Sequence, residues 1–174
     1  MTAKTAAPTA TEKFGPFGLD RANETKRLRG IANVEKYVTY EGPERHGQRM
    51  AISTEDNFIS LPFGGSPDPR HPYVKLNYTR QHMDRAETGA PEIFPDWSLH
   101  DAKIYSTPDP DLILVECYAH GRQFDPRFPE PDYYSNHYIL KIGLRDGLIR
   151  EVAEIFNPFE CFRDTGVNDP PKIL

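Results

Sequence analysis

The chain has 174 residues, of which 37% are hydrophobic and 27% are charged, and its formal net charge is −5. This length suffices for one domain with a core, and the composition is typical of a globular chain rather than a disordered one. The negative charge argues against nucleic-acid binding, because the longest basic cluster is the short run KRLR at 26–29. No apolar run reaches the length of a membrane span and the N-terminus lacks the apolar part of a signal peptide, so we expect a cytoplasmic protein with no membrane partner.

The N-terminal segment changes character near residue 18. Residues 1–17 are rich in Ala, Thr, Pro and Gly, so we expect a disordered arm followed by a single domain over residues 18–174. From Asp20 to Gly42 the spacing of apolar residues predicts one amphipathic helix, with Gly30 as the point where it can bend. The apolar positions of this helix are Leu28, Ile31, Val34 and Val38.

The remaining elements indicate the fold class. The segment from Arg49 to Gly65 predicts a strand or strand pair, and the loop Gly64–Pro72 is long enough to be a flap. Residues 77–93 predict a second helix, interrupted by Gly and Pro near its end. After Pro95 the chain predicts at least four consecutive strands. Helices first and antiparallel strands afterwards indicate an α+β domain, in which helices cover one face of a curved sheet that forms a cone with an open pocket.

Several classes of site lack their usual motifs. The six histidines and two cysteines have no spacing typical of a metal site, so we expect no metal. Cys117 lies in the apolar run LILVECY, which predicts a packed free thiol in a buried strand. Glycine-rich nucleotide-binding loops and a nucleophile elbow are absent, so we expect no nucleotide cofactor.

Residues 133–158 predict a long β-hairpin, because Asp146-Gly147 separates two runs rich in Ile, Leu, Val, Tyr and Phe. Alternate residues of the first arm share a mostly apolar face that should point inward. These residues are Tyr134, Asn136, Tyr138, Leu140, Ile142 and Leu144.

The turn decides the direction of Glu154. With Asp146-Gly147 alone as the loop, Glu154 lies on the face opposite Tyr134; with a three-residue loop from Arg145 and a bulge, Tyr138 pairs with Glu154. We favour the second register, which also pairs Leu144 with Leu148.

That register brings Leu148, Val152, Glu154 and Phe156 onto the apolar side. A carboxyl group that loses hydration favours its neutral form, and one tuned toward neutrality can act as a general acid and base. The alternative is a Glu154 on the outer face, in an ion pair with Arg150 or Lys141.

Four segments carry a resemblance to a known family: VEKYVTYEG, FPDWSLHDAKIYSTPDPDLILVEC, YYSNHYI and LRDGLIREVAEIFNP. They resemble the phenazine-biosynthesis A/B family, a branch of the nuclear-transport-factor-2-like (NTF2-like, SnoaL-like) and ketosteroid-isomerase-like superfamily. The resemblance runs from about Arg21 to Val167 and is strongest from Phe94 to Pro158.

The resemblance implies an NTF2-like conical barrel, usually a homodimer, whose pocket is part apolar and part polar. Members act without a cofactor in antibiotic biosynthesis, a part of secondary metabolism, on a small cyclic carboxylate. The amine of one aminocyclohexenone carboxylate condenses with the ketone of another, and loss of water forms an imine on the way to the phenazine tricycle.

The resemblance also implies roles for individual residues. By position, Glu154 is the acid/base group, Tyr134 is a pocket phenol that hydrogen-bonds the substrate, and Arg49 holds the substrate carboxylate. A guanidinium group suits that task, since it binds a carboxylate through two parallel hydrogen bonds. The alternative for Arg49 is a surface arginine at the start of a strand.

One position departs from the family pattern. The family's pocket histidine should lie eleven residues before Trp97, where this chain has Ala86. His82 takes that role only if an insertion of about four residues follows it. Trp97 itself is a candidate wall for a flat ring, although aromatic residues in strands are more often core.

Two other functions remain open at this stage. The first is another SnoaL-like cyclase, isomerase or dehydratase that acts on a small ring without a carboxylate. The second is a non-catalytic paralogue that binds a small molecule. We further expect that the outer face of the sheet, with His137 and Ile139, forms the contact of a homodimer.

Overall fold

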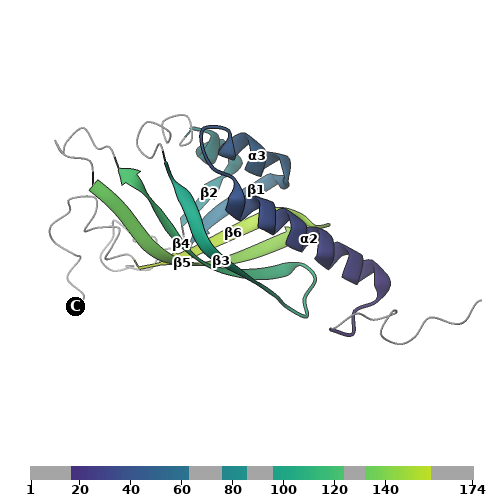
Figure 1. The fold of residues 1–174 in the computed structure, drawn as a ribbon. Helices are drawn as coiled ribbons and strands as arrows, with labels where there is room; N and C mark the ends of the chain where they lie inside the picture. Colours follow the sequence, from purple (N-terminus) through teal and green to yellow (C-terminus); the bar gives the residue numbers. More distant parts are fainter. Residues whose placement is uncertain (1–16, 63–75, 86–95, 124–131, 158–174) are drawn as a thin grey trace, which may run out of the picture.

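The computed structural model describes residues 17–62, 76–85, 96–123 and 132–157. The helices are α2 (Arg21–Thr39) and α3 (Arg45–Ala51), and residues 80–85 are also helical. The strands are β1 (Ser53–Leu61), β2 (Leu76–Thr79), β3 (Ser98–Ser106), β4 (Leu112–Gln123), β5 (Asp132–Arg145) and β6 (Leu148–Phe156). They form one sheet in the order β2-β1-β6-β5-β4-β3 (Figure 1).

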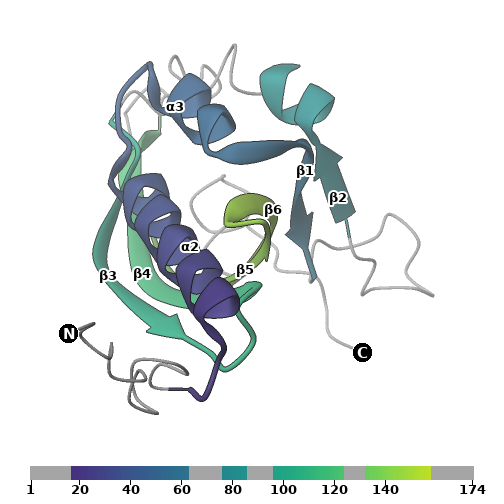
Figure 2. The same ribbon diagram turned by 90° about the vertical axis from the view of Figure 1, so that its right-hand side faces the viewer.

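The sheet is curved and open, and α2 lies within its curve (Figure 2). The predicted α+β class with an NTF2-like arrangement is confirmed, including the four consecutive antiparallel strands β3 to β6. One pairing departs from the expected antiparallel pattern, since β1 runs parallel to β6. The predicted N-terminal arm and the predicted flap Gly64–Pro72 fall outside the described residues, apart from Phe17.

Helix α2 begins where the sequence predicts. Its cap is Asp20, whose Oδ1 accepts a hydrogen bond from the backbone N–H of Asn23 at 2.9 Å. Val34 and Val38 are buried as predicted, whereas Leu28 is 53% exposed, so its assignment to the buried face was wrong. The helix continues through Gly30 without interruption.

Two segments differ from the prediction. Arg45–Ala51 is a helix and the strand begins only at Ser53, so Arg49 lies on α3 and not at the start of a strand. Leu76–Thr79 is a strand and helix starts at Arg80, whereas one helix was predicted from residue 77. Both helical segments are short and have little apolar periodicity, so tertiary contacts decide their conformation.

The hairpin turn is shorter than predicted. Asp146 and Gly147 have φ values of 53° and 76°, and Arg145 pairs with Leu148, so the loop has two residues. The predicted pairing of Leu144 with Leu148 was therefore wrong. Leu144 pairs instead with Ile149.

A bulge in β6 restores the predicted inward direction of Glu154. Leu144 pairs with Ile149, but the preceding residue Gly143 pairs with Glu151, which leaves Arg150 as an extra residue. Beyond this bulge Leu140 pairs with Glu154. Glu154 therefore shares the inward face of β5, as predicted, through a bulge at a different place.

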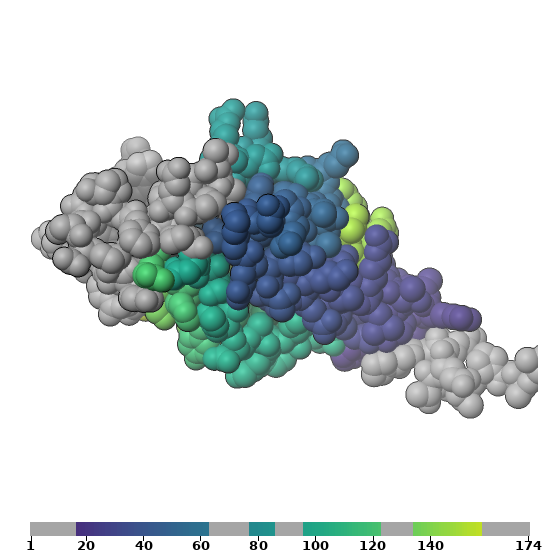
Figure 3. Space-filling model, turned by 45° about the horizontal axis from the view of Figure 1, so that its top comes forward, coloured from purple at the N-terminus to yellow at the C-terminus, as the bar shows by residue number. Residues whose placement is uncertain are grey.

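The core lies between this concave face and α2. The six predicted inward residues of β5 are all buried, with 0–6% of their surface exposed. Asn33 ties α2 to the hairpin, because its Nδ2 donates a hydrogen bond to the carbonyl oxygen of Gly147 at 2.8 Å. The space-filling view shows α2 and α3 covering much of one side of the molecule (Figure 3). No helix in the described ranges is long and apolar enough to cross a bilayer.

Gly30 sits where α2 approaches β5 most closely. A Cβ atom at this position would overlap Cδ1 of Leu144. We therefore expect Gly30→Ala to lower the free energy of unfolding by about 1–3 kcal/mol, the usual effect of overpacking, although alanine favours helix by about 1 kcal/mol. Chemical denaturation measures the difference.

The control is the double variant Gly30→Ala/Leu144→Ala. It should be more stable than the sum of the two single changes implies, because the smaller side chain removes the clash. Strict additivity would contradict the close approach.

Candidate functional site

A cavity of about 210 Å³ opens between α3, β1, β6 and the helical residues 80–85. It is smaller than the roughly 300–1,000 Å³ of drug-sized ligand sites, so its described walls suit a small substrate. Alternate residues of β1 and of β6 line it, which identifies it with the concave side of the sheet. The walls consist of Tyr37, His46, Arg49, Met50, Asn57, Ile59, Leu61, Tyr78, Met83, Val152 and Glu154.

Arg49 is held in place by α2. Its Nε donates a hydrogen bond to the carbonyl oxygen of Tyr37 at 3.1 Å, and its guanidinium carbon lies 4.4 Å from the centre of the Tyr37 ring. Its Nη2 is buried and has no hydrogen-bond partner among the described residues. A buried guanidinium nitrogen without an acceptor favours an anionic ligand, since leaving it unpaired is unfavourable.

Glu154 reaches the same cavity from β6. It lies two residues after Val152 on the inward face, and it is half-buried. The alternative, an outward Glu154 in an ion pair with Arg150 or Lys141, is excluded because Glu154 lines the cavity. Arg150 contacts Asp56 instead, with its Nε 3.5 Å from Oδ2. The structure thus brings Arg49 and Glu154 together.

Cys117 reports on the charges of this site. The thiol is fully buried in β4, as predicted, and burial together with the negative charge of Glu154 raises its pKa from 9.0 to about 11. The positive charge of Arg49 acts in the opposite direction on the same pKa. Both charged groups therefore lie within electrostatic range of Cys117.

Tyr134 and Trp97 form a separate aromatic cluster. Their rings stack with centroids 5.4 Å apart, and the Tyr134 hydroxyl lies 2.8 Å from that of Tyr138. Asn136 donates from Nδ2 to the Tyr134 oxygen at 3.0 Å and to the carbonyl oxygen of Asn157 at 2.9 Å. Neither Tyr134 nor Trp97 is among the described walls of the cavity.

The predicted histidine and the observed one differ. His82 is exposed, and its Nδ1 lies 3.0 Å from Oγ1 of Thr79, so the structure does not bring it to the cavity. His46 lines the cavity instead, and its Nε2 lies 2.7 Å from Oδ1 of Asp84. Ala86 is outside the described residues.

His46 and Asn57 are site residues that the sequence interpretation missed. A signal for His46 was present, because His46, Arg49 and Met50 have the i, i+3, i+4 spacing of one helix face. The interpretation of this region as a strand concealed it. Asn57 had no signal of its own, since its inward position follows from the pairing of β1.

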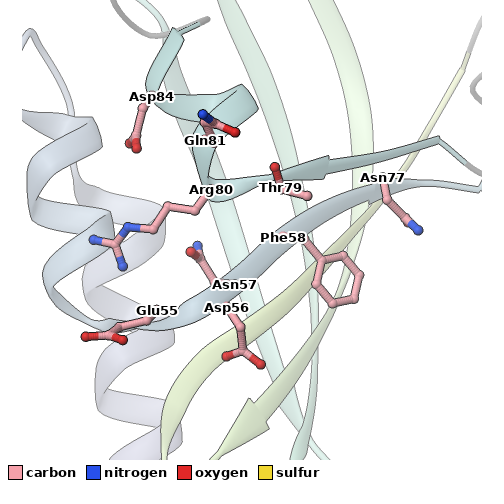
Figure 4. A pocket seen from close by; sticks show the side chains of 9 residues that line it. All are labelled: Glu55, Asp56, Asn57, Phe58, Asn77, Thr79, Arg80, Gln81 and Asp84. Carbon is pink, nitrogen blue, oxygen red and sulfur yellow. The ribbon is translucent and has the colours of Figure 1, made fainter.

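A second and wider hollow, of about 590 Å³, lies along β1, β2 and residues 80–85 (Figure 4). Three acidic residues line it, Glu55, Asp56 and Asp84. Asp56 is already engaged by the hairpin, with Arg145 Nη1 3.1 Å from Oδ2. Hydrogen bonds from Arg145 are the main reason that the pKa of Asp56 falls to about 2. The hollow contains none of the predicted site residues, and no three His, Cys, Asp or Glu residues in the described ranges are placed to hold a metal.

Comparison with known proteins identifies the family. The family model described as "Phenazine biosynthesis protein A/B" matches residues 12–173. The chain belongs to this family. It is 31% identical to phenazine biosynthesis protein PhzB of Pseudomonas fluorescens over 83% of this chain and 85% of that protein, and 32% identical to PhzB1 of Pseudomonas aeruginosa over 89% and 91%.

Solved structures agree with the fold. A phenazine biosynthesis-related protein of Pseudomonas aeruginosa, PhzB2, superimposes with a TM-score of 0.70 at 25% identity, covering 85% of this chain and 92% of that one. A putative polyketide cyclase from Xanthomonas campestris superimposes with a TM-score of 0.60 at 18% identity, over 81% and 99%. The second similarity concerns the fold alone.

The high pKa of Cys117 predicts a thiol that resists modification. In a Cys161→Ser variant, which leaves Cys117 as the single cysteine, the thiolate fraction at pH 8 should be about 100-fold lower than for a pKa of 9.0. The ionised form is the nucleophile, so reaction with a disulfide reagent should be correspondingly slow and should rise with pH up to about 11. Reaction at the rate of an exposed thiol would contradict this.

Adding Glu154→Gln to that variant tests the proximity of the two groups. Removing the negative charge should lower the pKa of Cys117, so the rise of reactivity should move to lower pH. An unchanged profile would contradict the proximity of Glu154 to Cys117.

Proposed function

We propose that this phenazine-biosynthesis family member is a cofactor-free enzyme for imine formation between two molecules of an aminocyclohexenone carboxylate. The observation that carries the proposal is the shared cavity of Arg49 and Glu154, a guanidinium group suited to a carboxylate and a carboxyl group suited to proton transfer. Membership of the family supports the class of substrate.

In this proposal Arg49 fixes the substrate. The buried Nη2 donates to the substrate carboxylate, while Tyr37 holds the other side of the guanidinium group. A fixed carboxylate places the ring against the inner face of β6, where Glu154 lies. Orientation of this kind lowers the entropic barrier of a condensation.

Glu154 then moves protons in both directions. As the amine nitrogen attacks the ketone carbon, the neutral carboxyl group gives its proton to the developing alkoxide, and the resulting carboxylate takes a proton from nitrogen to leave a carbinolamine. The carboxyl group next protonates the hydroxyl, which leaves as water while the nitrogen lone pair forms the C=N bond. The carboxylate finally takes the iminium proton, so Glu154 ends in its starting state.

The roles of the other predicted residues are narrower. Tyr134 and Trp97 do not contact the substrate in this proposal; they stabilise the neighbouring core, since their cluster continues through Tyr138 to Phe156, whose rings are 5.0 Å apart. His46 replaces His82 in this proposal as the histidine beside the substrate.

We also propose that the protein forms a homodimer through the outer face of β3, β4 and β5. This face exposes large apolar side chains in adjacent positions, and such contiguous patches mark interaction sites. The exposed fractions are Tyr105 48%, Leu114 36%, Tyr118 47% and Ile139 44%. His137 and Glu116, 3.2 Å apart, lie among them and give the face both polar donors and acceptors for a second copy.

Turnover of the freshly generated aminocyclohexenone carboxylate tests the catalytic proposal. Glu154→Gln should lower the rate of tricycle formation by about 10²- to 10⁴-fold between pH 5 and 9, the usual contribution of a general acid/base. The matched control is Glu151→Gln, on the same strand but outside the cavity, which should retain the rate. Equal rates for wild type, Glu154→Gln and the uncatalysed reaction would remove the proposal.

Arg49→Met tests whether Arg49 binds the carboxylate of the substrate. It should raise KM for the carboxylate substrate by about 10- to 150-fold, the equivalent of one hydrogen bond to a charged group. If wild type and Arg49→Met instead turn over a ring substrate that lacks a carboxylate at the same rate, the result would favour another cyclase, isomerase or dehydratase activity.

Sedimentation at micromolar concentration tests the dimer. Wild type should exceed the 19.9 kDa of one chain, and Ile139→Asp should dissociate it, because a charge would be buried in the contact. Leu28→Asp is the control, since Leu28 is similarly exposed but lies on α2. A monomeric wild type would contradict the dimer.

A further inference from the structure

Asn57 points into the cavity that holds Arg49 and Glu154. It alternates along β1 with Ile59 and Leu61, and these three residues all line that cavity. Asp56 and Asn57 leave the strand in opposite directions (Figure 4). Only 5% of the Asn57 surface is exposed.

The amide of Asn57 presents an acceptor. Its Nδ2 lies 3.6 Å from Sδ of Met50 and donates to it, whereas Oδ1 is buried without a partner among the described residues. The opposite orientation of the amide would set its oxygen against the thioether sulfur, and neither atom can donate. The oxygen is therefore the atom left for a ligand.

Two residues that line the cavity thus carry buried polar atoms of opposite kind, and neither atom has a hydrogen-bond partner in the part of the chain that the structure describes. Arg49 Nη2 is a charged donor, and Asn57 Oδ1 is a neutral acceptor. Buried polar atoms without partners disfavour an apolar occupant, and they favour a ligand that pairs both. Such a ligand carries a carboxylate and, elsewhere on the ring, an N–H or O–H group.

We propose that Asn57 is a specificity-determining residue, which selects ring carboxylates that also carry a hydrogen-bond donor and which holds the attacking amine. This inference rests on the proposed function for the identity of the amine and for the role of Arg49. A neutral amide oxygen accepts an N–H without removing its proton, so the amine keeps its lone pair for the ketone. Asn57 orients the nucleophile, and Glu154 moves the protons.

Binding of simple ring acids to the full chain tests the proposal without turnover. The probes are cyclohexanecarboxylate, its 2-, 3- and 4-hydroxy derivatives, and the corresponding methoxy derivatives, measured by titration calorimetry. At least one hydroxy acid should bind wild type roughly 5- to 150-fold more tightly than the parent acid, because it pairs the buried oxygen. Its methoxy counterpart lacks the donor and should show no such gain.

Variants assign the preference to Asn57. In Asn57→Leu the ratio of the affinity for the hydroxy acid to that for the parent acid should fall to about 1, because the acceptor oxygen is gone. Asn57→Asp keeps an acceptor and should retain the preference, but its charge should weaken binding of every carboxylate. The control Asn77→Leu, on the exposed surface of β2, should behave like wild type.

Two outcomes would overturn the proposal. One is equal affinity of wild type for parent, hydroxy and methoxy acids, and this comparison needs no variant to fold. The other is a hydroxy preference that persists unchanged in Asn57→Leu. Absence of condensation activity would remove the proposed function. It would not affect the binding result, in which wild type prefers the hydroxy acid and Asn57→Leu does not, so the two failures are distinguishable.

Discussion

The position of one extra residue in β6 determines the character of the whole site. Successive side chains of a strand point to opposite faces of the sheet. A two-residue turn without a bulge would therefore pair Glu154 with the outward-facing Ile139 and turn Glu154 outward. The bulge at Arg150 shifts the register by one and turns Glu154 inward, opposite Leu140. The extra residue is itself accommodated outside, where the Arg150 side chain contacts Asp56 of β1. An acid in the interior is thus a consequence of backbone geometry.

Arg49 shows the same division between support and function. The interactions that fix its guanidinium group come from Tyr37 of α2, while its side chain lines the cavity and its Nη2 has no hydrogen-bond partner among the described residues. Together with Asn57 Oδ1, this nitrogen represents hydrogen-bonding capacity that the described part of the chain does not use. Leaving such groups unpaired lowers stability, and a ligand that pairs them recovers that free energy on binding.

The two faces of the sheet have separate tasks because residues alternate along each strand. On β4 the inward Cys117 is fully buried near the charges of the cavity, whereas its neighbours Glu116 and Tyr118 face outward. The outward residues make contacts across strands, such as the hydrogen bond from the Tyr105 hydroxyl to Glu116 at 3.1 Å. Changes to one face should therefore leave the chemistry of the other largely unaffected.

The sequence by itself determined the elements whose patterns are local: the helix capped by Asp20, the buried strand around Cys117, the hairpin at Asp146-Gly147 and the family. Local patterns also predicted the inward face of β5 residue by residue. Only the tertiary structure decided the loop length and the bulge at Arg150, because both registers bury similar apolar residues.

The tertiary structure likewise decided that His46 and not His82 meets the cavity, and that Asn57 does. Each of these positions depends on which distant segments pack together, notably on the parallel pairing of β1 with β6. Residues far apart in sequence carry no local signal of such a contact, since loop closure and packing, and not propensity, select it.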